Sequence, residues 1–220
     1  MNGKSPPQDL VLPAPASGTE LPLFSALQRR HTERKISAAS LPAQLLGNLL
    51  WAGCGVNRLS GPFGLAGRTA PSASNSQEVD VYVALPEAAY RYDPAQHRLV
   101  VAAAEDLRGE AITPGQEGMW PTAPVQLIYV ADLERLDHTP GLDEPRLHAP
   151  DMQKAYCYVD CGLIAGHVGL FAAASGLAAW FHNCDRPALH AGLRLRPMQR
   201  VLFAQSVGYP EAQAHGALTA

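Results

Sequence analysis

The stretch "TAPSASNSQEVDVYVAL" (Thr69–Leu85) begins as a loop of short polar residues and ends as a strand. Between positions 70 and 77, seven of the eight residues are Ala, Ser, Asn or Gln, and the eighth is Pro71. None of these is a strong acid, a common metal ligand or a good nucleophile, but the polar ones can exchange hydrogen bonds with a ligand. From Val79 onward, alternating β-branched residues predict a strand over Val79–Leu85. The loop is therefore either a solvated turn or the wall of a polar binding site.

A second polar motif lies about forty residues upstream, in "RRHTERKI" (Arg29–Ile36). Arg30, Thr32 and Arg34 recur at every second position, so an extended backbone would place two guanidinium groups and a hydroxyl on one side. The planar donors of arginine match the oxygens of a phosphate. The alternative interpretation is a solvated basic face at the end of a helix.

Taken together, these motifs resemble those of the nitroreductase family of flavoproteins. The resemblance rests on Arg30-His31-Thr32-Glu33-Arg34 with Ile36, on "LLWAGCGVNR", and on "PSASNSQ" running into a strand. The hairpin "YRYDPAQHRL" is similar to that of the branch containing the thiazoline/oxazoline dehydrogenases, and "GLFAAASGLAAWF" and "VLFAQSVGYP" also match. The resemblance covers Leu21–Pro210.

The resemblance implies an α+β, nitroreductase-like fold: a mainly antiparallel central sheet flanked by helices, in a domain-swapped homodimer with two FMN sites at the interface. In such proteins the basic segment binds the FMN phosphate and ribityl chain, and the "PSxxN" loop reaches the flavin from the other subunit. A polar residue before the central strand contacts the isoalloxazine edge, and the backbone after the long helix approaches flavin N5, where His182-Asn183 replaces the frequent Glu-Gly. The implied cofactor-binding residues are Arg30, His31, Thr32, Arg34, Pro71, Ser72, Asn75, Gln116, His182 and Asn183.

The implied activity is hydride transfer from NADH or NADPH to an electron-poor acceptor, of nitroaromatic or quinone type, in two steps at N5. The flavin would carry this chemistry, so no side chain is expected to be catalytic. Two features depart from the family pattern. The tail "EAQAHGALTA" lacks the usual cation, and Glu78-Val79 replaces the usual Pro-Trp.

Three other functions stay open. The missing cation favours a catalytically silent flavin-fold scaffold or partner subunit, and the hairpin leaves room for an azoline-type dehydrogenase. A thiol or Ser/His hydrolase would use Cys157, Cys161 or a histidine. The chain has no G-x-S-x-G, however, and a thiolate is disfavoured in an apolar helix.

Composition limits the remaining classes. The 220 residues are 47% hydrophobic, enough for one core, and the formal net charge of −3 gives no excess of cations for nucleic acid. Charged residues make up only 17%, which favours a large subunit interface.

Cysteines and termini suggest the compartment. The four cysteines lack CxxC spacing and are expected to be reduced and buried, which predicts a cytoplasmic protein without a metal site. Residues 1–19 are expected to form an extended arm, and residues 20–220 a single FMN-binding domain.

The periodicity predicts helices over Glu20–His31, Ser40–Gly55, Lys154–Gly176 and Pro187–Leu193, with a helical turn at Ala102–Arg108. Ser40 is the expected N-cap of the second helix. It predicts strands over Val79–Leu85, Pro124–Asp132, Leu177–Cys184 and Arg200–Pro210, with a hairpin in Ala89–Val100. This order does not alternate, which disfavours a doubly wound sheet. The apolar stretch Cys161–Phe181 is interpreted as a helix buried on all sides in a soluble protein, rather than a membrane span.

Overall fold

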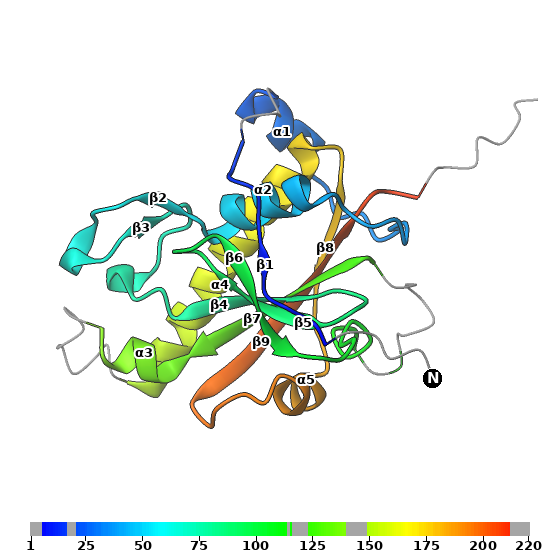
Figure 1. The fold of residues 1–220 in the computed structure, drawn as a ribbon. Helices are drawn as coiled ribbons and strands as arrows, with labels where there is room; N and C mark the ends of the chain where they lie inside the picture. Colours follow the sequence, from blue (N-terminus) through cyan, green and yellow to red (C-terminus); the bar gives the residue numbers. More distant parts are fainter. Residues whose placement is uncertain (1–5, 17–20, 114, 116–122, 140–148, 212–220) are drawn as a thin grey trace, which may run out of the picture.

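The computed structural model describes residues 6–16, 21–113, 115, 123–139 and 149–211 (Figure 1). Their main feature is a seven-stranded sheet with the order β1-β6-β5-β4-β7-β9-β8, in which every pair is antiparallel. Its strands are β1 (Leu10–Val11), β4 (Val79–Ala84), β5 (Ala89–Asp93), β6 (Arg98–Ala103), β7 (Val125–Asp132), β8 (Ala178–His182) and β9 (Gln199–Gly208). The predicted antiparallel sheet is confirmed, and so is the β5–β6 hairpin.

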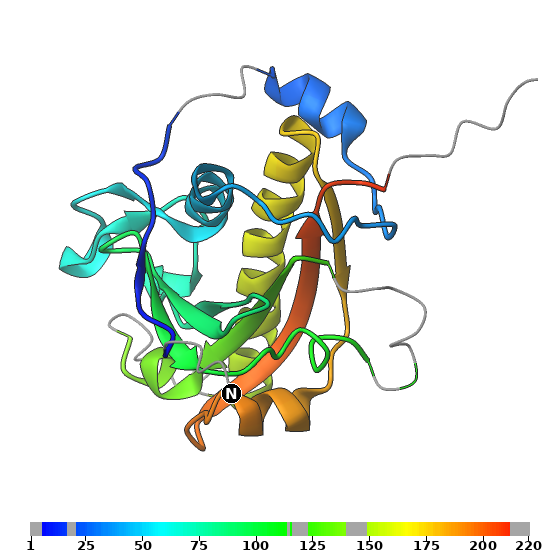
Figure 2. The same ribbon diagram turned by 45° about the vertical axis from the view of Figure 1, so that its right-hand side comes forward.

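Helices cover both faces of this sheet (Figure 2). They are α1 (Leu23–Arg29), α2 (Ala43–Cys54), α3 (Leu133–Asp137), α4 (Pro150–Ala174) and α5 (Arg186–Gly192). The larger core joins α2 and α4 to one face of β4 and β7, and the smaller core joins α5 to the other face. Both faces of β4 and β7 are therefore buried, which explains why the sequence of β7 is an almost continuous apolar run.

Several predicted boundaries were wrong. α2 begins at Ala43 behind Pro42, without a side-chain cap, so Ser40 is not its N-cap. The segment Ala102–Arg108 forms no helical turn, because β6 continues to Ala103 and turns follow it. The glycine-rich segment after α2 contains a small second sheet, β2 (Val56–Arg58) with β3 (Gly67–Arg68), and the short 3-10 helix η1 (Pro62–Gly64).

The expectation that the long helix is buried on all sides was also wrong for the single chain. α4 buries one stripe, which includes Cys157, Cys161 and Val168. On its outer face, Val159 is 58% exposed, and a Cβ added at Gly162 would meet nothing within 4 Å. By length and composition alone α4 could cross a membrane, with a mean hydropathy of 1.5. Its buried stripe packs on the sheet, as in the core helix of a soluble protein.

The N-terminal segment lies on its own chain. β1 pairs with β6 at the edge of the sheet, and the ring Nε2 of His97 lies 2.9 Å from the carbonyl of Pro13. The side chain of Asn48 contacts both the amide and the carbonyl of Ala16, at 3.1 Å each.

Candidate functional site

The basic segment, residues 30–34, leaves α1 in an extended conformation and runs beside the edge strand β8 (Figure 1). The amide of Glu33 donates to the carbonyl of Ala179, and the guanidinium of Arg34 lies 5.7 Å from the ring centre of Trp180. Arg30 and Arg34 are exposed and form no ion pair among the described residues. Their donors are therefore available to an anion.

A cavity of about 490 Å³ opens beside this segment, where α4 turns into β8. Its lining includes Arg29 of α1, His31 and Glu33 of the basic segment, and Leu177 and Ala178 around the start of β8. The predicted phosphate-binding segment thus borders a space large enough for part of a cofactor.

His182 lies at the far end of β8 from the basic segment. Because alternate strand residues share a face, Trp180 and His182 lie together, and their ring centres are 4.3 Å apart. The ring Nδ1 is 2.7 Å from the carbonyl of Asn183, and Nε2 is 2.9 Å from Oγ of Ser206. Burial lowers the pKa of His182, an effect that the Asn183 carbonyl partly opposes. The imidazole is therefore held in one orientation and favours its neutral form.

Residues 71–77 (loop 71–77) form the loop that leads into β4. Ser74, Asn75 and Gln77 have φ angles of 48°, 56° and 52°, in the left-handed region that non-glycine residues rarely adopt. Such a backbone persists only where surrounding contacts hold it, and it is common at ligand-binding sites.

Gln77 supplies many of those contacts. Its amide donates to Ser72 Oγ at 2.9 Å, its side-chain amide donates to Asn75 Oδ1 at 2.9 Å, and its Oε1 accepts from Arg68 Nε at 2.7 Å. Arg135 donates to the carbonyl of Gln77. Ser72 and Asn75 thus use part of their hydrogen-bonding capacity within the loop, while Pro71 is exposed.

The single chain does not bring loop 71–77 and the basic segment together. Val79, directly after the loop, pairs with Ala131, and Arg200 pairs with the same residue, so the loop lies near the first residues of β9. Ile36, directly after the basic segment, instead forms a bridge with Pro210 beyond the end of β9. Counted from Arg200, the two places are seven positions apart at Val207, the partner of the Ala179 that Glu33 contacts, and ten at Pro210, which is roughly 23–33 Å. One flavin nucleotide cannot touch both within one chain.

Two buried carboxyl groups underlie loop 71–77, and the sequence reasoning missed their pairing. Asp160 of α4 accepts a hydrogen bond from the amide of Ala73 at 2.9 Å, and Glu78 accepts one from Ser76 at 2.5 Å. Asp160 and Glu78 also line the same small cavity. Burial first, and the charge of Glu78 second, raise the pKa of Asp160 to about 7. The signal in the sequence was a single acid within the apolar stretch of α4.

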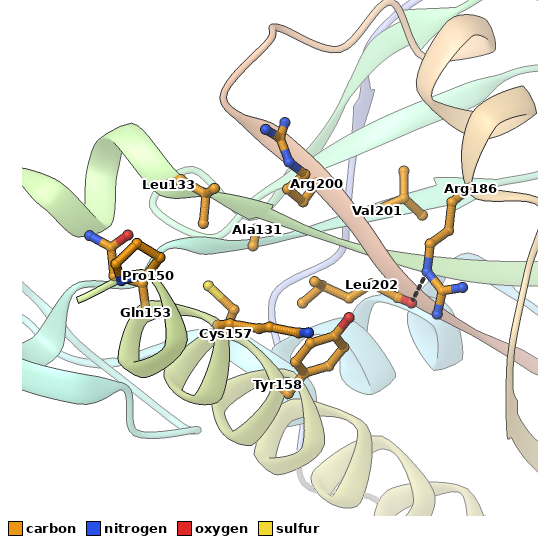
Figure 3. A pocket seen from close by; sticks show the side chains of 11 residues that line it. Ala131, Leu133, Pro150, Gln153, Cys157, Tyr158, Arg186, Arg200, Val201 and Leu202 are labelled. Atoms are coloured by element: carbon orange, nitrogen blue, oxygen red, sulfur yellow. Dashed lines mark hydrogen bonds between the residues drawn. The ribbon is translucent and has the colours of Figure 1, made fainter. Parts of the chain in front are cut away.

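A second cavity, of about 350 Å³, lies between the first half of α4 and β9 (Figure 3). Cys157 and Tyr158 point into it from α4, while Arg200 extends from β9 and Arg186 from the start of α5. The Nε of Arg186 donates to the carbonyl of Leu202, and its Nη2 donates to Asn183. This contact links the cavity to the end of β8 that carries His182.

The four cysteines are free and buried, as predicted. Burial raises the pKa of Cys54 and of Cys184 to about 11 and that of Cys157 to about 12. The pKa of Cys161 is raised further, also by burial. These thiols are therefore protonated at neutral pH, which argues against a cysteine nucleophile. The predicted contact residue Gln116 lies outside the described residues.

The chain combines an antiparallel sheet with a long, partly exposed helix and a basic segment along the edge strand. These features define a class of α+β proteins, and known structures share this fold. A profile of the nitroreductase family matches residues 27–209. A crystal structure of a protein from Ralstonia eutropha JMP134, provisionally named a nitroreductase, is 30% identical with a TM-score of 0.80, covering 96% of this chain and 97% of that one. The chain belongs to the nitroreductase family.

More distant structures share the fold alone. A provisionally named nitroreductase from Anabaena variabilis is 18% identical with a TM-score of 0.66, and the match covers 86% of this chain and 38% of that one. The NADPH:FMN oxidoreductase of Vibrio harveyi, solved with NAD+, is 16% identical with a TM-score of 0.58, covering 86% of this chain and 69% of that one. No curated protein matches the chain.

Proposed function

We propose that this nitroreductase-family protein is an FMN-dependent oxidoreductase that transfers hydride from NADH or NADPH to an electron-poor small molecule, of nitroaromatic or quinone type. The observation that carries the proposal is the arrangement along β8. Exposed arginines without ion-pair partners among the described residues lie at its start, and a fixed imidazole lies at its end. Family membership and the named activity of the Vibrio harveyi relative support it.

The residues along β8 fit FMN. Glu33 anchors the basic segment at Ala179, and Asn183 follows four residues later, roughly 13 Å along the strand. A ligand with a phosphate at one end and a ring at the other matches this separation. Arg30, Thr32, Arg34 and His31 would hold the phosphate and ribityl chain, and Asn183 with His182 would contact the ring.

When bound, FMN supplies hydride acceptance and delivery at N5. The protein's own residues bind the cofactor and hold it in one orientation. The guanidinium groups of Arg30 and Arg34 offer charge-assisted hydrogen bonds, the strongest class available to a phosphate. His182 remains neutral, and contacts with the Asn183 carbonyl and Ser206 hold both ring nitrogens, so the imidazole can pack beside the flavin without adding a charge. Ser206 has one hydrogen to donate, and it serves either His182 or Gln126.

The site requires a second copy of the chain in this proposal. Loop 71–77 and the basic segment lie too far apart in one chain, so Pro71, Ser72 and Asn75 would reach the flavin of a partner in a domain-swapped homodimer. The exposed apolar face of α4 supports such an interface. Gly162→Leu should therefore produce a monomer in size-exclusion chromatography, while the control Gly109→Leu, on a turn with open space around it, should stay dimeric. A wild-type monomer that binds one FMN per chain would refute the shared site.

Flavin binding tests the phosphate assignment. Replacing both Arg30 and Arg34 with alanine removes charge-assisted hydrogen bonds worth about 1.5–3 kcal/mol each, so FMN affinity should fall at least a hundredfold. The matched control is Lys35→Ala, an exposed cation one residue downstream that does not line the cavity. Fluorescence quenching of added FMN measures both. Undiminished binding by the double variant would show that the basic segment does not hold the phosphate.

A second candidate is a flavin-fold scaffold or partner subunit, which the lack of a cation in "EAQAHGALTA" favours. Purified protein that is colourless and takes up no added FMN would support it. An azoline-type dehydrogenase, from the branch that the hairpin resembles, would instead bind FMN that no nicotinamide reduces. The buried free cysteines support a cytoplasmic location. The arm of residues 1–19 and the domain of residues 20–220 remain part of the proposal.

A further inference from the structure

Glu78 and Asp160 form an unusual pair beneath loop 71–77. Glu78 is 0% exposed and Asp160 is 4% exposed, and they come from segments 82 positions apart. Glu78 Oε1 is one of the buried side-chain atoms without a hydrogen-bond donor among the described residues. A buried carboxylate oxygen without a donor is costly, unless the neighbouring carboxyl supplies a proton.

Among the described residues, neither acid forms an ion pair with a cation. Arg68 of β3 lines the same small cavity as both acids, but its Nε donates to Gln77. Arg135 of α3 is bound to Asp80 and to the carbonyl of Gln77. The other titratable groups facing the pair are thiols that stay protonated, from α2 and α4: Cys54, Cys157 and Cys161. Two carboxylates in such surroundings cannot both ionise without a large cost.

We propose that Glu78 and Asp160 hold one proton between them, and that this shared proton fastens loop 71–77 to α4. The pair would thus be a positioning element for the wall of the flavin site. Only this last step rests on the proposed function; the shared proton and the fastening of the loop do not.

Two hydrogen bonds from the loop to the carboxyl groups show how the shared proton holds the loop in place. Asp160 Oδ2 accepts from the amide of Ala73, and Glu78 Oε2 accepts from Ser76 Oγ. With the proton present, the carboxyl groups attract each other and close this connection. When the proton leaves to solvent, two negative charges repel each other, and the loop loses support for its left-handed residues. The raised pKa of Asp160 brings this release near neutral pH.

Hydrogen exchange of the Ala73 amide in the flavin-free protein tests the proton directly. After correction for intrinsic exchange, protection in the wild type should fall as pH rises from about 4 to about 7, by at most about tenfold per pH unit, and level off above pH 7. In Asp160→Asn, the new amide can donate to Glu78 and still accept from Ala73, so protection should not depend on pH. Protection in Glu78→Gln should also be independent of pH. This variant serves as the test if Asp160→Asn does not fold. The exposed control Glu105→Gln should follow the wild type.

Wild-type protection that stays constant between pH 4 and 7, or pH dependence that persists in both amide variants, would overturn the proposal. FMN titrations then test the link to the flavin. The wild-type dissociation constant should rise above pH 7, and that of Asp160→Asn should not. FMN affinity that weakens equally in both proteins would overturn the positioning role. Failure of every protein to bind FMN would overturn the positioning role together with the proposed function, and would leave the exchange result intact.

Discussion

Asp160→Asn should change how the stability of the protein depends on pH. The pKa of Asp160 rises from 3.8 to about 7 on folding, chiefly through burial. The folded chain therefore binds this proton more tightly than the unfolded chain, and the free energy of unfolding falls as pH rises from about 4 to about 7. Three pKa units correspond to about 4 kcal/mol, and sharing of the proton with Glu78 reduces the expected effect to about 2–4 kcal/mol.

The assay is urea unfolding at a series of pH values between 4 and 8. Asparagine cannot titrate. From pH 4 to pH 8, the unfolding free energy of the variant should therefore rise by about 2–4 kcal/mol relative to that of the wild type. The titrating groups other than Glu78, which is coupled to Asp160, are common to both proteins and cancel in the difference. The control Glu105→Gln should give a constant difference, because that side chain is exposed. Parallel curves for wild type and Asp160→Asn would refute the reasoning.

Two further predictions concern packing and the N-terminal segment. A Cβ on Gly208 would lie 2.6 Å from Ile36 Cγ2 and 2.8 Å from Pro124 Cδ, so Gly208→Ala should lower the unfolding free energy by about 1–3 kcal/mol, and unchanged stability in urea would contradict this packing. His97→Asn keeps a residue suited to the left-handed φ of 48° but cannot reach the Pro13 carbonyl, so the amide of Leu12 should exchange faster; equal exchange would show that the imidazole does not hold this segment.

The sequence predicted elements well where one physical signal dominated. The run at β7 and the alternation at β4 were recognised because burial on a sheet requires them. The start of α2 was misplaced because Ser40 has the side chain of a typical N-cap, whereas the helix begins behind Pro42 without any side-chain cap. The exposure of α4 was missed because composition reports how apolar a helix is, but not what covers each face.

The candidate site was predictable only as separate segments. Residues 30–34 and 71–77 were both identified as polar binding segments, but local patterns carry no information on the register that separates them by the length of β9. The partnership of Glu78 and Asp160 depends on the packing of α4 against the start of β4, a contact between distant parts of the chain. Residue type alone could mark Asp160 as unusual but could not name its partner.

Anaerobic titration of the FMN-loaded protein with NADH and NADPH tests the central claim most directly. The account predicts that the visible absorption of the flavin is lost with about one equivalent of nicotinamide per chain, and that a nitroaromatic or quinone acceptor restores it. FMN that stays oxidised with both nicotinamides, or protein that binds no FMN, would contradict the account.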